Sequence, residues 1–167
     1  DITIVAYFWL DLAFGAADGA PEIYPHLAAS QTGLLVAFIN GIYDSLPASA
    51  TIVDGMESHG YGAKGLSDYY RLRALREQKY KQLIAPENYL KMLTQTKLAV
   101  AIYLDYYRNR REDPPPFWEA MQEENLSPLQ FFRRNFYHTV AFSDEYVWLF
   151  YSAPYKWYNI RDMHPTF

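Results

Sequence analysis

A strand-like run, a helical segment and a second strand-like run follow one another in the first third of the sequence, and this order limits the fold most strongly. Residues 2–10 form an unbroken apolar run rich in β-branched and aromatic side chains, which is typical of a strand buried on both faces. Residues 32–46 carry apolar side chains at helical spacing, and residues 50–53 form a second strand that ends at Asp54. This order predicts a crossover connection and therefore parallel strands.

The rest of the sequence is predicted to be mainly helical up to a final strand. Residues 11–30 are rich in Ala, Gly, Pro and Asp, which predicts a long loop. Helices are predicted over residues 64–83 and 86–107, and a further helix starts at Ser127. Residues 145–151 return to a strand-like pattern. A helical insertion is therefore expected before the last strand.

The length of the chain limits which α/β fold it can form. Its 167 residues are fewer than the roughly 250 of a complete eight-stranded (β/α) barrel. We therefore predict an α/β fold that is part of a TIM-type barrel, with about the last three parallel strands. Residues 1–167 would be a single domain or the C-terminal fragment of such a barrel, and the N-terminal half of the barrel would be missing. Uncovered sheet edges would then make the isolated chain marginally stable.

Several classes of function are disfavoured by the composition. The net charge of −4 and the pI of about 5.5 argue against a nucleic-acid partner. The chain has no cysteine, so disulfides, thiolate metal sites and cysteine nucleophiles are excluded. It lacks a glycine-rich phosphate loop and a run of about 18 apolar residues, so we expect no cofactor and no membrane span. The compartment stays open, because an upstream signal peptide would make the protein extracytoplasmic.

An acidic turn follows the second strand and supplies the candidate catalytic residues. Asp54 and Glu57 lie three residues apart beside Gly55, directly after an apolar strand. Parallel α/β folds place their sites at the carboxyl ends of strands, where two carboxylates can divide the roles of acid and base. His59 follows closely and could join them. The alternative is that Asp54 caps the turn and Glu57 is solvated.

Aromatic side chains are the second candidate feature. The chain contains 16 Tyr, 10 Phe and 4 Trp, whose flat rings can pack in a core or stack against sugar rings. Those near predicted strand ends, together with two polar neighbours, are the candidate substrate-binding residues: Trp9, Asp11, His59, Tyr61, Trp148, Tyr151, Tyr155 and Trp157. A packing role for the aromatic members is the alternative.

Five segments carry a resemblance to a known group of proteins. They are residues 35–42, 54–58, 85–89, 101–105 and 143–148. Together they resemble the C-terminal half of an uncharacterised bacterial family of glycoside-hydrolase-like TIM barrels. The resemblance implies barrel strands six to eight, with the helical insertion between the last two.

The same resemblance implies the positions of the site residues. It points to Asp54 and Glu57 at the end of the penultimate strand, and to Trp148 and Tyr151 in the last one. Related-looking sequences are expected to carry Asn or Tyr where this chain has Met56, and an aromatic residue where it has His59.

The sequence therefore predicts a carbohydrate-active hydrolase in which strand-end carboxylates carry out acid–base chemistry on a carbohydrate or another small polar substrate. One alternative is a non-catalytic saccharide-binding or scaffold barrel that uses Trp148, Tyr155 and Trp157. The other is a metal-dependent hydrolase that uses Asp11 with Asp54 and His59, whose side chains can hold a divalent cation.

Overall fold

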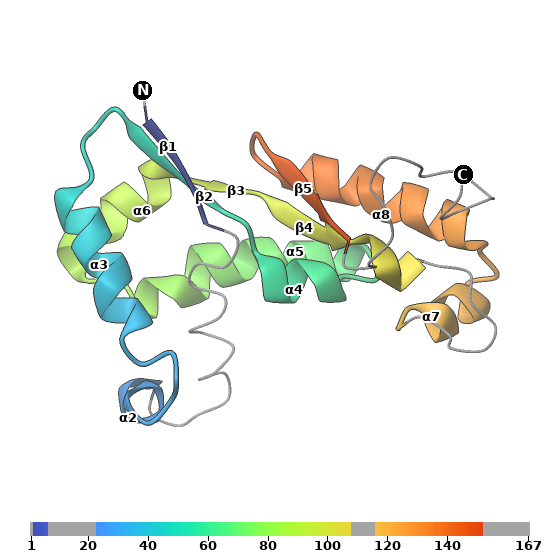
Figure 1. Cartoon of the computed structure of the whole chain (residues 1–167), viewed down its shortest axis with the longest axis horizontal. Coiled ribbons are helices and arrows are strands. Elements are labelled where there is room, and N and C mark those ends of the chain that lie inside the picture. Colours follow the sequence, from blue (N-terminus) through green and yellow to red (C-terminus); the bar gives the residue numbers. More distant parts are fainter. Residues whose placement is uncertain (1, 7–22, 108–115, 152–167) are drawn as a thin grey trace.

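A computed structural model describes residues 2–6, 23–107 and 116–151 (Figure 1). The strands are β1 (Ile2–Ala6), β2 (Ala50–Asp54), β3 (Thr96–Leu98), β4 (Val100–Tyr103) and β5 (Val147–Phe150). The α-helices are α2 (Ile23–Ala28), α3 (Leu35–Ser45), α4 (Glu57–Gly62), α5 (Leu66–Ala74), α6 (Tyr89–Gln95), α7 (Trp118–Glu123) and α8 (Pro128–Phe142). The π-helical segment η1 (Leu75–Lys79) continues α5, and the short 3₁₀ segments are η2 (Tyr80–Gln82), η3 (Pro86–Asn88) and η4 (Leu104–Tyr107).

The strands form two small sheets in which every pairing is parallel. One sheet has the order β1-β2-β3 and the other pairs β4 with β5. Ala99 alone separates β3 from β4, and its backbone N–H donates to the carbonyl of Asp54 at 2.8 Å. The two sheets are therefore joined through one extended segment. This confirms the predicted α/β class with parallel strands, whereas the described strands form open sheets and not a closed barrel.

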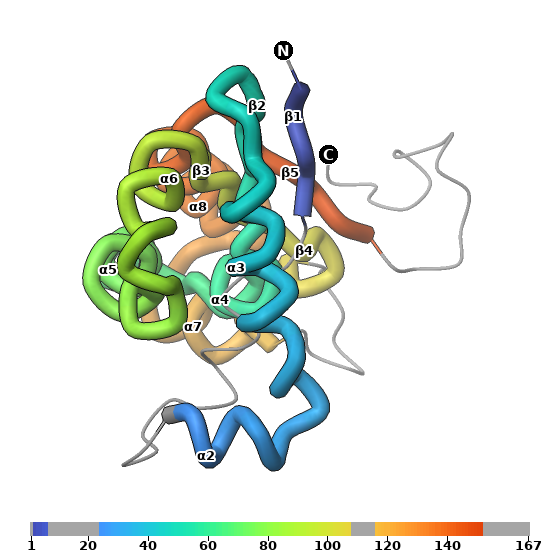
Figure 2. Tube along the Cα trace, turned by 90° about the vertical axis from the view of Figure 1, so that its left-hand side faces the viewer, coloured from blue at the N-terminus to red at the C-terminus, as the bar shows by residue number. Residues whose placement is uncertain are grey.

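Helices cover one side of this sheet. Figure 2 shows α5, α6 and α8 on the same side of the strands. The largest apolar cluster lies between these helices, α3 and the strands, and it includes fully buried Ile39, Ile52 and Leu98. A second cluster, built around Ile102 and Phe131, packs β4 against η4, α7 and α8. Burial of these side chains on one face holds the strands and helices together.

Most predicted elements of the crossover unit are confirmed. The helix predicted over residues 32–46 is α3, and the strand predicted over residues 50–53 is β2. The last helix begins where Ser127 caps it, because the Ser127 hydroxyl accepts the Gln130 N–H and the Gln130 side chain bonds back to the Ser127 N–H. The final strand β5 also lies where the sequence places it.

The prediction of one long helix over residues 86–107 is wrong. The helix α6 ends at Gln95, and the chain then enters β3 and β4. Leucines at helical spacing favoured a helix, but Thr96, Val100 and Ile102 are β-branched and are buried in the sheet. The predicted helical insertion before the last strand therefore contains a strand segment that runs through the middle of the sheet.

Two further predictions differ in part. The loop predicted over residues 11–30 contains α2, and residues 11–22 lie outside the described part of the chain. The helix predicted over residues 64–83 begins as α5 and continues through the π-helical segment η1 and the 3₁₀ segment η2.

Candidate functional site

Aromatic rings from three elements meet where strands β4 and β5 end. In the β4–β5 register Ala101 lies beside Trp148 and Tyr103 beside Phe150, so these side chains share one face of the sheet. That face is opposite to the one on which Ile102 packs against the helices. Tyr61 of α4 completes the group. We call Tyr61, Tyr103, Trp148 and Phe150 the rim aromatic cluster.

The rings of the rim aromatic cluster are in direct contact. The centroid of the Tyr61 ring lies 5.1 Å from that of Tyr103, 5.5 Å from that of Trp148 and 6.0 Å from that of Phe150. The Tyr103 and Phe150 centroids are 5.3 Å apart. These separations fall within the range of favourable aromatic pairs. The cluster remains accessible, because Phe150 is 39% exposed and the other three rings are half-buried.

The acidic turn after β2 is tied to strands on both sides. The Gly55 N–H donates to the carbonyl of Ala6 in β1 at 2.7 Å. The Gly55 carbonyl accepts the indole N–H of Trp148 at 2.8 Å. Asp54 is 1% exposed, and its carboxylate accepts the backbone N–H of Met56 at 3.2 Å. Asp54 therefore braces the turn, and Trp148 fixes the turn to the rim aromatic cluster.

The turn reverses through a left-handed residue that is not glycine. Met56 has a φ of 45° and is fully buried, and the Tyr80 hydroxyl contacts its sulfur at 3.4 Å. A non-glycine residue in this conformation costs roughly 1 kcal/mol or more, so surrounding contacts must hold it. The left-handed step turns the chain directly into α4, which begins at Glu57.

Close packing of α4 on β4 depends on a glycine. A Cβ atom at Gly60 would lie 2.8 Å from the backbone nitrogen of Ala101 and 2.9 Å from its carbonyl oxygen. Since these are backbone atoms that cannot rotate away, only glycine allows this approach. The approach places the next residue, Tyr61, against Tyr103.

Glu57 and Tyr61 form the polar part of the site. The Tyr61 hydroxyl is buried, and among the described residues it has no well-formed hydrogen-bond partner. Burial raises the pKa of Tyr61, and the nearby negative charge of Glu57 raises it further. Tyr61 is therefore a neutral phenol at any physiological pH. The half-buried Glu57 carboxylate stands beside this phenol at the edge of the rim aromatic cluster.

The structure brings some of the predicted site residues together. Glu57, Tyr61 and Trp148 lie at one place, and Asp54 lies in the adjoining turn but is buried. His59 is half-buried on α4, and Tyr151 is buried just after β5. The predicted residues outside the described part of the chain are Trp9, Asp11, Tyr155 and Trp157.

Two members of the rim aromatic cluster were not among the predicted site residues. Tyr103 falls in the segment predicted to be helical, and Phe150 was assigned only to the strand. The sequence did contain a signal for Tyr103, because Val100 and Ile102 alternate with it in a strand-like pattern. A strand prediction there would have placed Tyr103 at a strand end.

The described residues include no group of three His, Asp or Glu side chains that could hold a metal ion. In the same part of the chain, every helix is too short or too polar to cross a membrane. Comparison of the whole chain with protein-family models, curated proteins and solved structures finds no significant match.

Proposed function

We propose that the chain supplies the carbohydrate-binding end of a carbohydrate-active hydrolase, with Glu57 as its acid–base residue. The observation that carries the proposal is the position of the Glu57 carboxylate beside Tyr61, within the rim aromatic cluster at the carboxyl ends of parallel strands. Sites of parallel α/β proteins lie at this end of the strands.

The rim aromatic cluster suits a sugar because it offers both apolar and polar contacts. A pyranose ring presents C–H groups that stack on aromatic faces, and its hydroxyls need hydrogen-bond partners at the edge of the stack. Phe150 and Trp148 supply ring surface, and Glu57 supplies an acceptor. The small, partly exposed surface favours a short saccharide.

Hydrolysis of a glycosidic bond needs a second carboxyl group about 5 to 9.5 Å from the first. Asp54 is buried and braces the turn, so we assign it a positioning role for Glu57. The second carboxylate would then come from outside the described residues, where Asp11 is a candidate by its place in the sequence after β1.

The test compares hydrolysis of a panel of oligosaccharides by the wild-type chain and by Glu57→Gln. General acid–base catalysis contributes about 10²- to 10⁴-fold, so Glu57→Gln should lose at least about 100-fold in kcat while it keeps the folded state. Glu87→Gln, at an exposed position of η3, is the matched control and should hydrolyse like the wild type. Full activity of Glu57→Gln would remove Glu57 from the mechanism.

A non-catalytic saccharide-binding role is the second candidate function. It is favoured by the burial of Asp54, since one of the two predicted catalytic carboxylates cannot reach a substrate directly. Under this alternative the wild type binds saccharides without hydrolysing them, and Glu57→Gln binds as tightly as the wild type. Trp148→Ala should then abolish binding, because it removes both a ring of the cluster and the bond to Gly55.

A further inference from the structure

A polar cavity of about 360 Å³ lies at the start of β3, whereas the rim aromatic cluster lies at the end of β4. It is bounded by the end of α5 and η1, by the end of α6 and by the start of β3. The charged side chains that line it are Arg73, Arg76, Glu77, Lys97 and Asp144. Nothing in the proposed carbohydrate site uses these residues.

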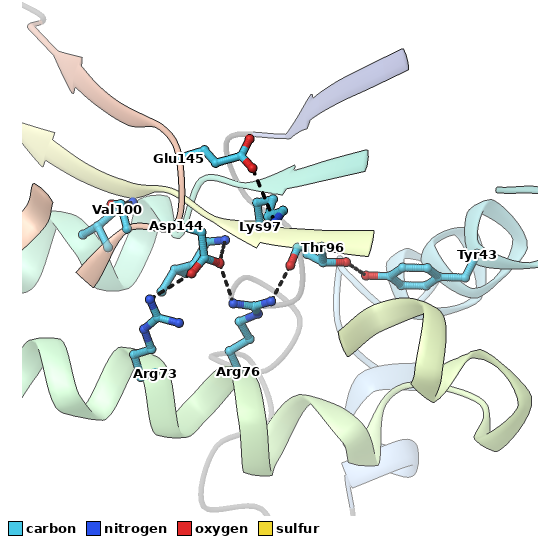
Figure 3. Close-up of polar contacts among 10 residues, drawn as sticks. Tyr43, Arg73, Arg76, Thr96, Lys97, Val100, Asp144 and Glu145 are labelled. Carbon is cyan, nitrogen blue, oxygen red and sulfur yellow. Dashed lines mark hydrogen bonds and ion pairs between the residues drawn. The ribbon is translucent and has the colours of Figure 1, made fainter. Parts of the chain in front are cut away.

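Asp144 occupies only part of the hydrogen-bonding capacity of the two arginines. Its carboxylate accepts one N–H from Arg73 at 2.9 Å and one from Arg76 at 2.8 Å (Figure 3). It also accepts the backbone N–H of Leu98 at 2.7 Å. Both carboxylate oxygens are therefore engaged. Each guanidinium carries five N–H donors, so donors remain on both arginines.

Arg76 contains a donor that is buried without an acceptor. The residue is 8% exposed, and its second terminal nitrogen donates to the carbonyl of Thr96. Its Nε atom is buried and has no hydrogen-bond partner within the described part of the chain. A buried donor of this kind is costly, and buried polar groups of native proteins are nearly always satisfied.

Arg73 and Lys97 supply accessible donors at the wall of the cavity. Among the described residues, Arg73 makes a single side-chain hydrogen bond, through one terminal nitrogen, and its side chain is 31% exposed. Lys97 meets Glu145 at 3.4 Å, and both of these side chains are more than a third exposed, so this ion pair is weak. Both cations are available to a ligand.

The charge of the cavity wall differs in sign from that of the chain. Three basic side chains and two carboxylates give the wall a formal charge of +1, whereas the chain carries −4. A local excess of positive charge in a cavity attracts an anion even when the whole chain is negatively charged.

We propose that this cavity binds a small oxyanion, the phosphate or carboxylate group of a small molecule, through Arg73, Arg76 and Lys97. An oxyanion offers several acceptor oxygens to donors that the protein leaves unused. The volume lies at the lower end of the range found for small-molecule pockets, so the ligand is small.

The experiment measures thermal unfolding of the whole chain during titration with inorganic phosphate and, separately, with succinate, against sodium chloride at equal ionic strength. Arg73→Gln and Lys97→Gln remove partly exposed donors and keep the buried Arg76 in place. Arg71→Gln is the matched control, because Arg71 lies on the same helix with a side chain that is 72% exposed and does not line the cavity.

The proposal predicts saturable stabilisation by at least one of the two anions in the wild type and in Arg71→Gln. Each cavity variant should bind that anion at least about tenfold more weakly, since a charge-assisted hydrogen bond is lost. Stabilisation by phosphate alone assigns a tetrahedral ligand, and stabilisation by succinate alone assigns a carboxylate. Absence of stabilisation by either anion, or equal stabilisation of all variants, would overturn the proposal.

Discussion

Replacing Asp144 by asparagine tests the contact that fastens β5 to the rest of the sheet. Asp144 lies three residues before the first residue of β5, and its backbone N–H donates to the carbonyl of Leu98 at 2.8 Å. Its carboxylate binds Arg73 and Arg76, as Figure 3 shows. It also accepts the backbone N–H of Leu98. The side chain thereby links the strand to the helical layer formed by α5 and η1.

The expected loss of stability follows from the exposure of the three side chains. Breaking a fully buried ion pair costs about 3–5 kcal/mol, and breaking an exposed one costs about 0–1 kcal/mol. Asp144 and Arg73 are 21% and 31% exposed, and Arg76 is 10% exposed. We therefore expect Asp144→Asn to lose about 2–3 kcal/mol, which corresponds to a fall in Tm of roughly 4–12 °C for a chain of this length.

The pH dependence of the same variant provides an independent check. Burial alone would raise the pKa of Asp144, but the Leu98 N–H, Arg76 and Arg73 together outweigh it and lower the pKa below its usual value. The carboxylate therefore stabilises the folded state fully above the unfolded-state pKa of about 3.9, and this stabilisation is lost as the pH falls through the lower folded-state pKa.

Urea unfolding at pH 7 and at steps down to pH 3 measures both effects. The difference between the wild type and Asp144→Asn should be constant from about pH 7 to 5 and should shrink below about pH 4. Glu145→Gln is the control. Its exposed pair with Lys97 should contribute less than about 0.5 kcal/mol. A difference below about 0.5 kcal/mol at pH 7, or one that persists unchanged to pH 3, would refute the reasoning.

Two other predictions concern packing. Gly60→Ala should destabilise the fold by about 1–3 kcal/mol in urea unfolding, because the added Cβ meets the Ala101 backbone. Gly62→Ala is the control: its Cβ enters open space, so the change should be neutral or stabilise by up to about 1 kcal/mol. Equal effects of the two changes would contradict the close packing of α4. Lys91→Met should lower the free energy of unfolding by about 1 kcal/mol, because the Lys91 ammonium donates to the carbonyls of Tyr43, Asp44 and Leu46 at the end of α3. Thermal unfolding measures the loss, and an unchanged Tm would show that this cap is not needed.

Local patterns in the sequence were sufficient to predict the strands and the helix of the crossover unit, and the start of α8. The apolar spacing of α3, the short β-branched run of β2 and the Ser127 cap of α8 are signals contained within a few residues. The segment from Thr96 to Tyr103 was misread because a short buried run fits either a helix or a strand. Its identity depends on its neighbours, since β2 flanks it on one side and β5 on the other.

For the candidate site, individual residues could be predicted from the sequence, but the contacts between them could not. The acidic turn was predicted because it follows a strand, and Trp148 was predicted from the aromatic run of the last strand. The structure brings both together. Their contact was not predictable, because the bond from Trp148 to Gly55 joins residues 93 positions apart. The approach of α4 to Ala101 was equally hidden, since a glycine in a helix does not reveal which backbone it touches.

The most direct test of the central claim is to locate bound saccharide by NMR. In ¹⁵N-labelled protein titrated with a panel of short oligosaccharides, the indole N–H of Trp148 and the backbone amides of Gly60 and Tyr103 should shift in a saturable way. These groups surround the rim aromatic cluster beside Glu57. If every saccharide leaves these resonances unchanged, or shifts only resonances remote from the cluster, the rim aromatic cluster is not a carbohydrate site.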